Sequence, residues 1–227
     1  MCGIVGYTGK KQAAQFLLDG LATLEYRGYD SAGVEVLSPD GELHGVKCAG
    51  RVSILADRCK TANLTGTTGI AHTRWATHGA PTDKNAHPHL DCTGRIAIVH
   101  NGIIENYREL RSYLARNGHT FASDTDSEVV AHLVEDAWDG PCKGDLVAAV
   151  SNAVSRLEGS WALAVVCADA PDQLVVARNG SPLVVASTPE GAYAASDVTP
   201  LASVTAHVIQ LENGQIARLE KSGKVTV

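Results

Sequence analysis

Strand-like and helix-like segments fall in separate runs along this sequence, and that order constrains the fold more than any other feature. Candidate strands at 32–38 and 42–48 are joined through Pro39-Asp40-Gly41, which is typical of a hairpin. Hairpin-linked strands, with helices in a run of their own, favour an α+β fold with antiparallel sheets over a parallel βαβ sheet. The last third adds strand candidates at 161–167, 173–178, 183–187, 192–196, 205–211 and 215–219.

Helices are predicted where apolar residues recur with helical spacing. Residues 10–25 form one such segment, and 51–62 is a further candidate. Strands are expected at 3–8 and at 95–100, the latter ending at Asn101-Gly102. Three helices follow, and Thr125-Asp126-Ser127-Glu128 fits a capping box for the second. The apolar faces, in chain order, are Ala14, Leu17, Leu18 and Leu21; Ile103, Tyr107, Leu110 and Leu114; Val129, Val130, Leu133, Val134 and Ala137; and Leu146, Val150, Ala153, Val154 and Leu157.

Composition narrows the class of protein. With 44% apolar and 19% charged residues, disorder and fibrous repeats are excluded. The formal net charge of −6 argues against a nucleic-acid or membrane partner, which would need a basic field. The longest apolar run, 161–168, is far shorter than the roughly 20 residues of a membrane span. We see no secretory signal and no C-x-x-C pair, so we expect one cytoplasmic domain over 1–227 without disulfides.

Cys2 is the first candidate for chemistry. It follows Met1, and cysteine is small enough for that methionine to be removed, which would place an α-amine and a thiol on one residue. Their ordinary pKa values are about 7.7–8.0 and about 8.5, so the amine can take the thiol proton without a histidine. This is the arrangement of an N-terminal nucleophile. The alternative is an incidental small residue.

Two further pairs of residues have a structural and a chemical interpretation. Asn101-Gly102 is either a turn or an oxyanion hole, in which the Asn amide and the Gly N–H donate to a developing negative charge. Arg74 and Asp126 are either ordinary charges or a clamp for a free amino acid. In the clamp, Arg74 would bind the α-carboxylate and Asp126 the α-ammonium. As an ordinary charge, Asp126 would favour a helix N-terminus.

Histidines cluster in the middle of the chain and raise the question of a metal site. Their spacing matches no ligand pattern closely, and we expect neither a metal nor another cofactor. The stretch from Thr67 to Pro88 starts as a strand and continues as a long aperiodic loop, which in compact domains is often functional. The clustered histidines are His72, His78, His87, His89 and His100.

Ordered motifs over nearly the whole chain resemble the glutaminase domains of class II glutamine amidotransferases, which are N-terminal-nucleophile hydrolases. The residues within these motifs are most similar to those of the glutamine–fructose-6-phosphate aminotransferase family. Amidophosphoribosyltransferases tend to have Gln in place of Tyr29 and Tyr-Ser in place of Trp75-Ala76, and asparagine synthetases tend to have RGPD near Arg27. The motifs are MCGIVG at 1–6, EYRGYDSAG at 25–33, HTRWATHG at 72–79, NAHPH at 85–89, VHNGIIENY at 99–107, SDTDSEVVAHL at 123–133, NGSPL at 179–183 and ASD at 195–197.

The resemblance implies a fold and a role for each candidate residue. The family fold is a four-layer αββα sandwich with two stacked antiparallel sheets. Cys2 would attack the glutamine side-chain amide, and Asn101 and Gly102 would bind the oxyanion. Around them, Arg74 and Asp126 would clamp the substrate, Thr77 and His78 would line the pocket, Arg27 and Gly28 would lie beside the nucleophile, and Trp75 would sit where ammonia leaves.

The resemblance also bears on the extent of the function. Because the family continues into a half that binds fructose 6-phosphate, we expect this chain to hold the glutaminase and not that isomerase half. Ammonia from glutamine would serve glucosamine 6-phosphate formation in a longer, homodimeric enzyme. The alternatives are the glutaminase domain of another class II amidotransferase, a non-catalytic amino-acid-binding module, and a metal-dependent hydrolase built on the histidines.

Overall fold

Two antiparallel sheets and two groups of helices make up the computed structural model, which describes residues 2–227. The first sheet contains β1 (Gly3–Gly9), β2 (Ser31–Leu37), β3 (Leu43–Ala49), β4 (Thr68–Arg74), β9 (Val184–Thr188), β10 (Gly191–Ala195) and β11 (Ile209–Gln210). The second contains β5 (His89–Leu90), β6 (Ile96–Ile104), β7 (Gly159–Cys167), β8 (Gln173–Asn179), β12 (Ile216–Glu220) and β13 (Val225–Thr226). The α-helices are α1 (Ala13–Leu24), α2 (Val52–Cys59), α3 (Tyr107–Arg116), α4 (Glu128–Asp139) and α5 (Leu146–Val154), and short 3₁₀ helices lie at η1 (Glu25–Arg27) and η2 (Thr199–Leu201).

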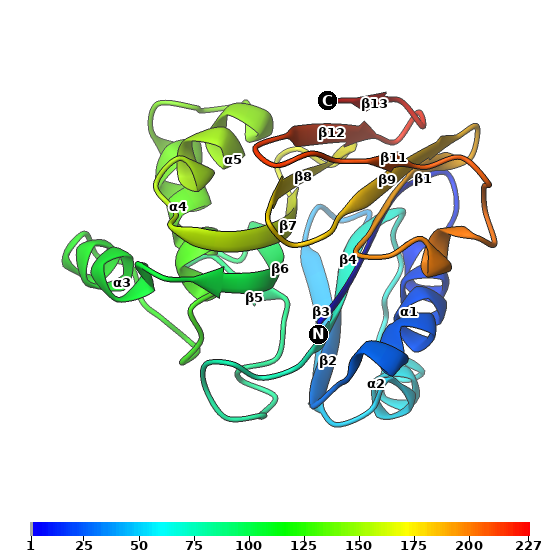
Figure 1. Ribbon diagram of the computed structural model, residues 1–227, viewed down its shortest axis with the longest axis horizontal. Helices are drawn as coiled ribbons and strands as arrows, with labels where there is room; N and C mark the ends of the chain where they lie inside the picture. Colours follow the sequence, from blue (N-terminus) through cyan, green and yellow to red (C-terminus); the bar gives the residue numbers. More distant parts are fainter. Residues whose placement is uncertain (1) are drawn as a thin grey trace.

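The elements form four layers. The first sheet has the strand order β11-β9-β10-β1-β4-β2-β3, and the second has the order β13-β12-β8-β7-β6-β5. Helices α1 and α2 cover the outer face of the first sheet, while α3 to α5 lie on the side of the second (Figure 1). The expected α+β fold with an αββα sandwich is therefore confirmed.

Three hydrophobic cores correspond to the three interfaces between these layers. Leu17 and Leu21 of α1 pack with Val5 and Val34 of the first sheet. Ile4 and Val99 belong to the core between the two sheets. The core between the second sheet and its helices joins strand residues to helix residues such as Ile98, Leu163, Val130 and Val150.

Central strands are buried on both faces, which explains their unbroken apolar sequences. In β7, Leu163 and Val165 face the helices, whereas Ala162 and Ala164 face the other sheet. Alternation along a strand therefore sends successive side chains into two different cores. Residues 162–167 of the apolar run therefore lie in a doubly covered strand.

The structure corrects several predicted boundaries. Strand β6 does not end at Asn101-Gly102 but continues to Ile104, so Ile103 belongs to a strand and not to the face of α3. The strand expected at 205–211 is reduced to Ile209–Gln210 at the edge of the first sheet.

The predicted capping box is absent from the start of α4. Ser127 occupies the N-cap position without a side-chain cap, and its hydroxyl pairs with His100 Nδ1 at 2.8 Å. The Glu128 carboxylate instead accepts hydrogen bonds from the N–H groups of Ala122 and Ser123. The Ser127 hydroxyl and the Glu128 carboxylate are therefore hydrogen-bonded to other groups and do not cap the helix.

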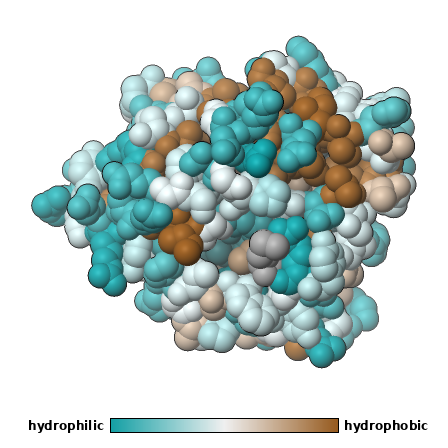
Figure 2. All heavy atoms as spheres, viewed as in Figure 1, coloured by the Kyte–Doolittle hydropathy of each residue, from teal (hydrophilic) through white to brown (hydrophobic). Residues whose placement is uncertain are grey.

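Apolar side chains are exposed at one edge of the molecule. Figure 2 shows a mostly hydrophilic face with apolar side chains gathered at the upper right, where β9 and β11 lie in Figure 1. Ile209 of edge strand β11 and the adjacent Val208 are both exposed. Within residues 2–227, no helix has the length and apolar character needed to cross a membrane.

The layer model makes a direct prediction for α1. Leu17 is fully buried against β4, so Leu17→Ala is expected to lower the free energy of unfolding by about 2–5 kcal/mol through lost contacts and a cavity. Leu90→Ala is the matched control, because Leu90 is 38% exposed. Urea unfolding followed by circular dichroism measures both, and equal midpoints for the two variants would contradict the layer assignment.

Candidate active site

Cys2 lies at the start of the central strand pair of the first sheet. Strand β1 pairs with β4 so that Gly3 stands opposite Thr73, which brings Cys2 to the residues that follow β4. The backbone N–H of Trp75 donates to Cys2 Sγ at 3.2 Å. The nucleophile candidate is thus held by the first residue of the aperiodic loop.

The environment of the Cys2 thiol disfavours its charged form. Burial raises the pKa of Cys2, and the hydrogen bond from Trp75 and the positive charge of Arg74 oppose that rise. A thiol in this setting needs a base close by to become a nucleophile.

Asn101 reaches Cys2 from the opposite sheet. Its Nδ2 donates to the Cys2 carbonyl at 3.2 Å, and its Oδ1 lies 2.9 Å from His72 Nε2. Because a side-chain carbonyl only accepts, His72 must donate at Nε2, which turns the Asn101 amide nitrogen towards Cys2. Burial lowers the pKa of His72 to about 3, so this histidine is a neutral positioning residue.

Gly102 is required by close packing and not by a turn. It lies within β6 opposite Trp161, with φ of 131°, and a Cβ there would be 2.0 Å from the carbonyl oxygen of Ser160. The turn interpretation of Asn101-Gly102 is therefore wrong.

A cavity of about 330 Å³ opens in front of Cys2. Ser160, Ser181 and Pro182 also line it. Sequence reasoning missed these three, although 179–183 was recognised as a family motif. The predicted site residues on its wall are Cys2, Arg27, Trp75, Thr77, Asn101 and Gly102.

Arg27 contacts Cys2, and Gly28 packs against the Trp75 ring. Arg27 Nε donates to the Cys2 carbonyl at 3.2 Å, and its guanidinium pairs with Asp197 at 3.3 Å. Gly28 has φ of 104°, and a Cβ there would lie 2.5 Å from the Trp75 ring. The glycine therefore leaves room for the indole that covers this side of the site.

Arg74 and Asp126 are both buried and both connect to His78. Arg74 donates to the carbonyl oxygens of His78 and of the two residues after it. Asp126 accepts from Ile104 N–H at 2.9 Å, and its other oxygen lies 3.8 Å from His78 Nδ1. Neither charge lies on the wall of the Cys2 cavity, so in this conformation Arg74 and Asp126 hold the loop and the clamp stays a prediction.

Three of the clustered histidines, His72, His87 and His89, form a buried stack, whereas His78 is half-buried and packs against Tyr107. The His87 ring lies 4.2 Å from His72 and 4.4 Å from His89, centroid to centroid. Burial lowers the pKa of His87, His89 and His100. Within residues 2–227, no three members of the stack bring one nitrogen each close enough to share an ion, so this structure does not support a metal hydrolase built on them.

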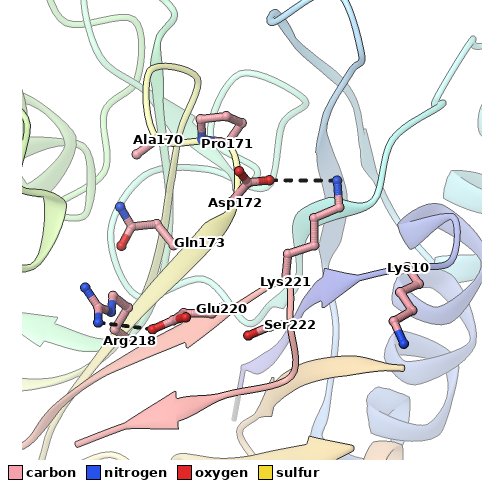
Figure 3. Close-up of a pocket in the computed structure, with 9 residues that line it drawn as sticks. All are labelled: Lys10, Ala170, Pro171, Asp172, Gln173, Arg218, Glu220, Lys221 and Ser222. Atoms are coloured by element: carbon pink, nitrogen blue, oxygen red, sulfur yellow. Dashed lines mark ion pairs between the residues drawn. The ribbon is translucent and has the colours of Figure 1, made fainter. Parts of the chain in front are cut away.

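A second hollow, of about 800 Å³, lies away from Cys2 (Figure 3). Four of its five charged side chains form two ion pairs, Asp172 with Lys221 at 3.8 Å and Arg218 with Glu220 at 3.0 Å, and Lys10 is the fifth. None of its lining residues is a cysteine, although it is larger than the cavity at Cys2.

The fold and the half-buried thiol facing Asn101 and Gly102 define an N-terminal-nucleophile amidotransferase architecture. Comparison with known families agrees. The model described as "Glutamine amidotransferase domain" matches residues 72–203, and the chain belongs to this family.

Curated relatives contain a similar sequence as one part of a longer chain. The chain is 50% identical over 224 residues to the isomerizing glutamine–fructose-6-phosphate aminotransferase of Thermosynechococcus vestitus, and 51% identical over 225 residues to that of Thermotoga maritima. Each alignment covers 98% of this chain and 36% of the relative. The chain thus spans about a third of the length of these proteins.

A solved structure shares the fold at lower identity. The glutamine phosphoribosylpyrophosphate amidotransferase of B. subtilis, determined with ADP and GMP, superimposes with a TM-score of 0.82 at 26% identity. The match covers 99% of this chain and 49% of that one.

The histidine stack predicts a dependence of stability on pH. His87 is neutral when folded, and neither ring nitrogen has a hydrogen-bond partner among the described residues. The unfolded chain therefore binds more protons below pH 6.5, and stability is lost as the pH falls from there towards the lower folded pKa. We expect His87→Leu to lessen the loss of unfolding free energy between pH 7 and pH 5 by up to about 2 kcal/mol.

The control for this experiment is His207→Gln, at an exposed histidine. Urea titrations at pH 7, 6 and 5 provide the measurement. A pH profile for His87→Leu that parallels the unaltered protein would refute the assignment of a neutral buried ring.

Proposed function

We propose that this domain hydrolyses the side-chain amide of L-glutamine to glutamate and ammonia, with Cys2 as nucleophile. The observation that carries the proposal is the position of the Cys2 thiol in a cavity with Asn101 and Gly102. Membership of the glutamine amidotransferase domain family supplies the substrate class.

The first step requires a base for a thiol whose pKa is raised by burial. We propose that Met1, which lies outside the described residues, is removed and that the freed α-amine of Cys2 takes the thiol proton. Sulfur then attacks the amide carbon, and the carbonyl oxygen becomes an oxyanion. The C–N bond breaks, ammonia leaves with the proton from the amine, and water later cleaves the γ-glutamyl thioester to glutamate.

Two donors are suited to the oxyanion. The Asn101 amide nitrogen is already directed towards Cys2 by its bond with His72, and Gly102 follows on the same rigid strand. In this role Asn101 Nδ2 would give up its hydrogen bond to the Cys2 carbonyl and donate to the oxyanion instead. Each such donor typically contributes a factor of about 10²–10³ in rate.

The remaining polar residues are suited to the amino-acid end of glutamine. In the proposal, Arg74 exchanges loop carbonyls for the α-carboxylate, and Asp126 takes the α-ammonium. Thr77 and His78 line that part of the pocket, and Trp75 stands at the exit for ammonia. This assignment requires the loop after β4 to rearrange when glutamine binds.

The activity of the whole protein is a wider proposal. Because the relatives are fructose-6-phosphate aminotransferases of about three times this length, we propose that residues 1–227 form one glutaminase domain of such an enzyme. The ammonia would convert fructose 6-phosphate to glucosamine 6-phosphate, and the whole enzyme would be a homodimer. An amidophosphoribosyltransferase is less favoured, because the structural relative of that kind is 26% identical and this chain has Tyr29 and Trp75-Ala76.

Removal of the nucleophile tests the proposal. Cys2→Ala is expected to abolish glutamate release, while Cys59→Ala, at a half-buried thiol outside the Cys2 cavity, retains it. Protein with a free Cys2 terminus, verified by intact mass, should also gain one adduct at Cys2 from a diazoketone analogue of glutamine. Full turnover in Cys2→Ala would overturn the mechanism, and glutamine binding without turnover in the processed protein would favour the binding module.

The clamp is tested by a substitution that keeps the shape of Asp126. Asp126→Asn retains an oxygen for Ile104 N–H but loses the negative charge. A hydrogen bond to a charged group is worth about 1.5–3 kcal/mol, so KM for glutamine should rise about 10- to 100-fold. Steady-state glutaminase kinetics provide the readout, and an unchanged KM would show that Asp126 does not bind the substrate.

A further inference from the structure

Four side chains converge outside the Cys2 cavity, at the edge of the second sheet. The first is on the turn after β5, the second follows α3, and the last two are one turn apart on α4. One ligand atom from each lies within 4.8 Å of every other. They are Cys92, His119, His132 and Glu135.

The distances within this group match tetrahedral coordination of one small ion. Cys92 Sγ lies 3.5 Å from Nδ1 of His119 and 3.5 Å from Nδ1 of His132. Zinc bonds of about 2.3 Å to sulfur and about 2.0–2.1 Å to nitrogen, at tetrahedral angles, place those atoms about 3.5 Å apart. Glu135 Oε2 completes the group at 2.9 Å and 3.1 Å from the same two nitrogens.

The outer partners of the histidines are also those of a metal site. His119 Nε2 lies 2.7 Å from Asp136 Oδ1, and His132 Nε2 lies 3.6 Å from Glu128 Oε1. Metal-binding histidines usually donate their far N–H to a carboxylate, which leaves the lone pair of the near nitrogen for the ion. In addition, Thr120 N–H lies 3.4 Å from Cys92 Sγ and would stabilise a thiolate.

Without an ion, the same contacts require the rings to be doubly protonated. Asp136 takes the Nε2 proton of His119, so a hydrogen bond from Nδ1 to Glu135 requires that ring to carry a second proton. The same holds for His132 if Glu128 takes its Nε2 proton. A divalent cation removes this requirement, because it binds both lone pairs and its charge balances one thiolate and one carboxylate.

We propose that Cys92, His119, His132 and Glu135 bind one zinc ion in a structural site. One sulfur, two imidazole nitrogens and one carboxylate oxygen suit zinc and not magnesium or calcium, which prefer oxygen ligands. Four protein ligands leave no open position for catalysis. Cys92 is exposed, which gives the ion access.

The ion would fasten the segment between α3 and α4. His119 lies near the start of that connection, His132 and Glu135 lie on α4, and Cys92 would anchor them to the edge of the sheet. The proposal departs from the expectation of a metal-free domain, and it concerns none of the histidines in the buried stack. A second group, Asp40, Glu42 and His44, has no sulfur and belongs to an exposed hairpin, so it carries no proposal.

The test uses the 227-residue chain without a polyhistidine tag, stripped with a chelator and given zinc chloride in the presence of excess magnesium. We expect one zinc per chain to remain after desalting. The melting temperature should rise by about 5–10 °C at a zinc concentration about 100-fold above Kd. Cobalt in place of zinc should show the charge-transfer band of a thiolate ligand.

Matched variants locate the site. Cys92→Ser, nearly isosteric at an exposed position, and His132→Gln should each weaken zinc binding by more than about 100-fold. Cys142→Ser, at a cysteine outside the group, should bind zinc like the unaltered chain. If Cys92→Ser or His132→Gln fails to fold, His119→Gln is tested in its place. Absence of retained zinc, an unchanged melting temperature, a cobalt spectrum without the thiolate band, or equal binding by Cys92→Ser would each overturn the proposal.

Discussion

The hydrogen bond from His72 to Asn101 joins the two sheets at the point where the site is built. Its 2.9 Å length requires β4 and β6 to approach closely across the central core. The approach is possible because many side chains in this interface are small. The alanines are Ala97, Ala162, Ala164, Ala192, Ala194 and Ala217. Larger residues there would separate the sheets and move the Asn101 amide away from Cys2. The packing of the whole sandwich and the geometry of the candidate oxyanion hole therefore depend on the same residues.

The site couples one rigid wall to one adaptable wall. Asn101 and Gly102 lie within β6, a long central strand, whereas Trp75 and Thr77 belong to a loop that is held by Arg74 and by the bond from Ala76 N–H to Asp30. A rigid strand suits the donors that must be placed for the oxyanion, since misplaced donors lose most of their effect. A loop suits the part that must admit glutamine and then enclose it. The Arg74 guanidinium donates to carbonyl oxygens of the loop. In the proposed mechanism, the substrate carboxylate would replace these contacts.

Sequence reasoning succeeded where the signal is local and failed where a distant contact decides. Apolar periodicity placed α1 and α4, and the turn at Pro39-Asp40-Gly41 placed the hairpin of β2 and β3. Neither signal gave the number of sheets, which came from the family resemblance. Asn101-Gly102 has the composition of a turn, yet Ser160 on the neighbouring strand makes glycine necessary inside β6. The capping box failed because the Glu128 carboxylate accepts from Ala122 and Ser123, and because Thr125 Oγ1 pairs with His89 Nε2 at 3.0 Å. The Cys92 group was missed because its members are spread over more than forty positions and match no familiar ligand spacing.

Buried histidines and a buried carboxyl group respond to acid in opposite ways. The neutral buried histidines stabilise the fold at neutral pH and lose that contribution as the pH falls. Glu35 acts in the other direction, because burial raises its pKa to about 7 and its contribution falls as the pH rises from about 4.5 to 7. Between pH 4.5 and 6.5 Glu35 therefore offsets part of the loss from the histidines. Several histidines oppose one carboxyl group, so the net balance still favours neutral pH, where a terminal amine can also act as a base.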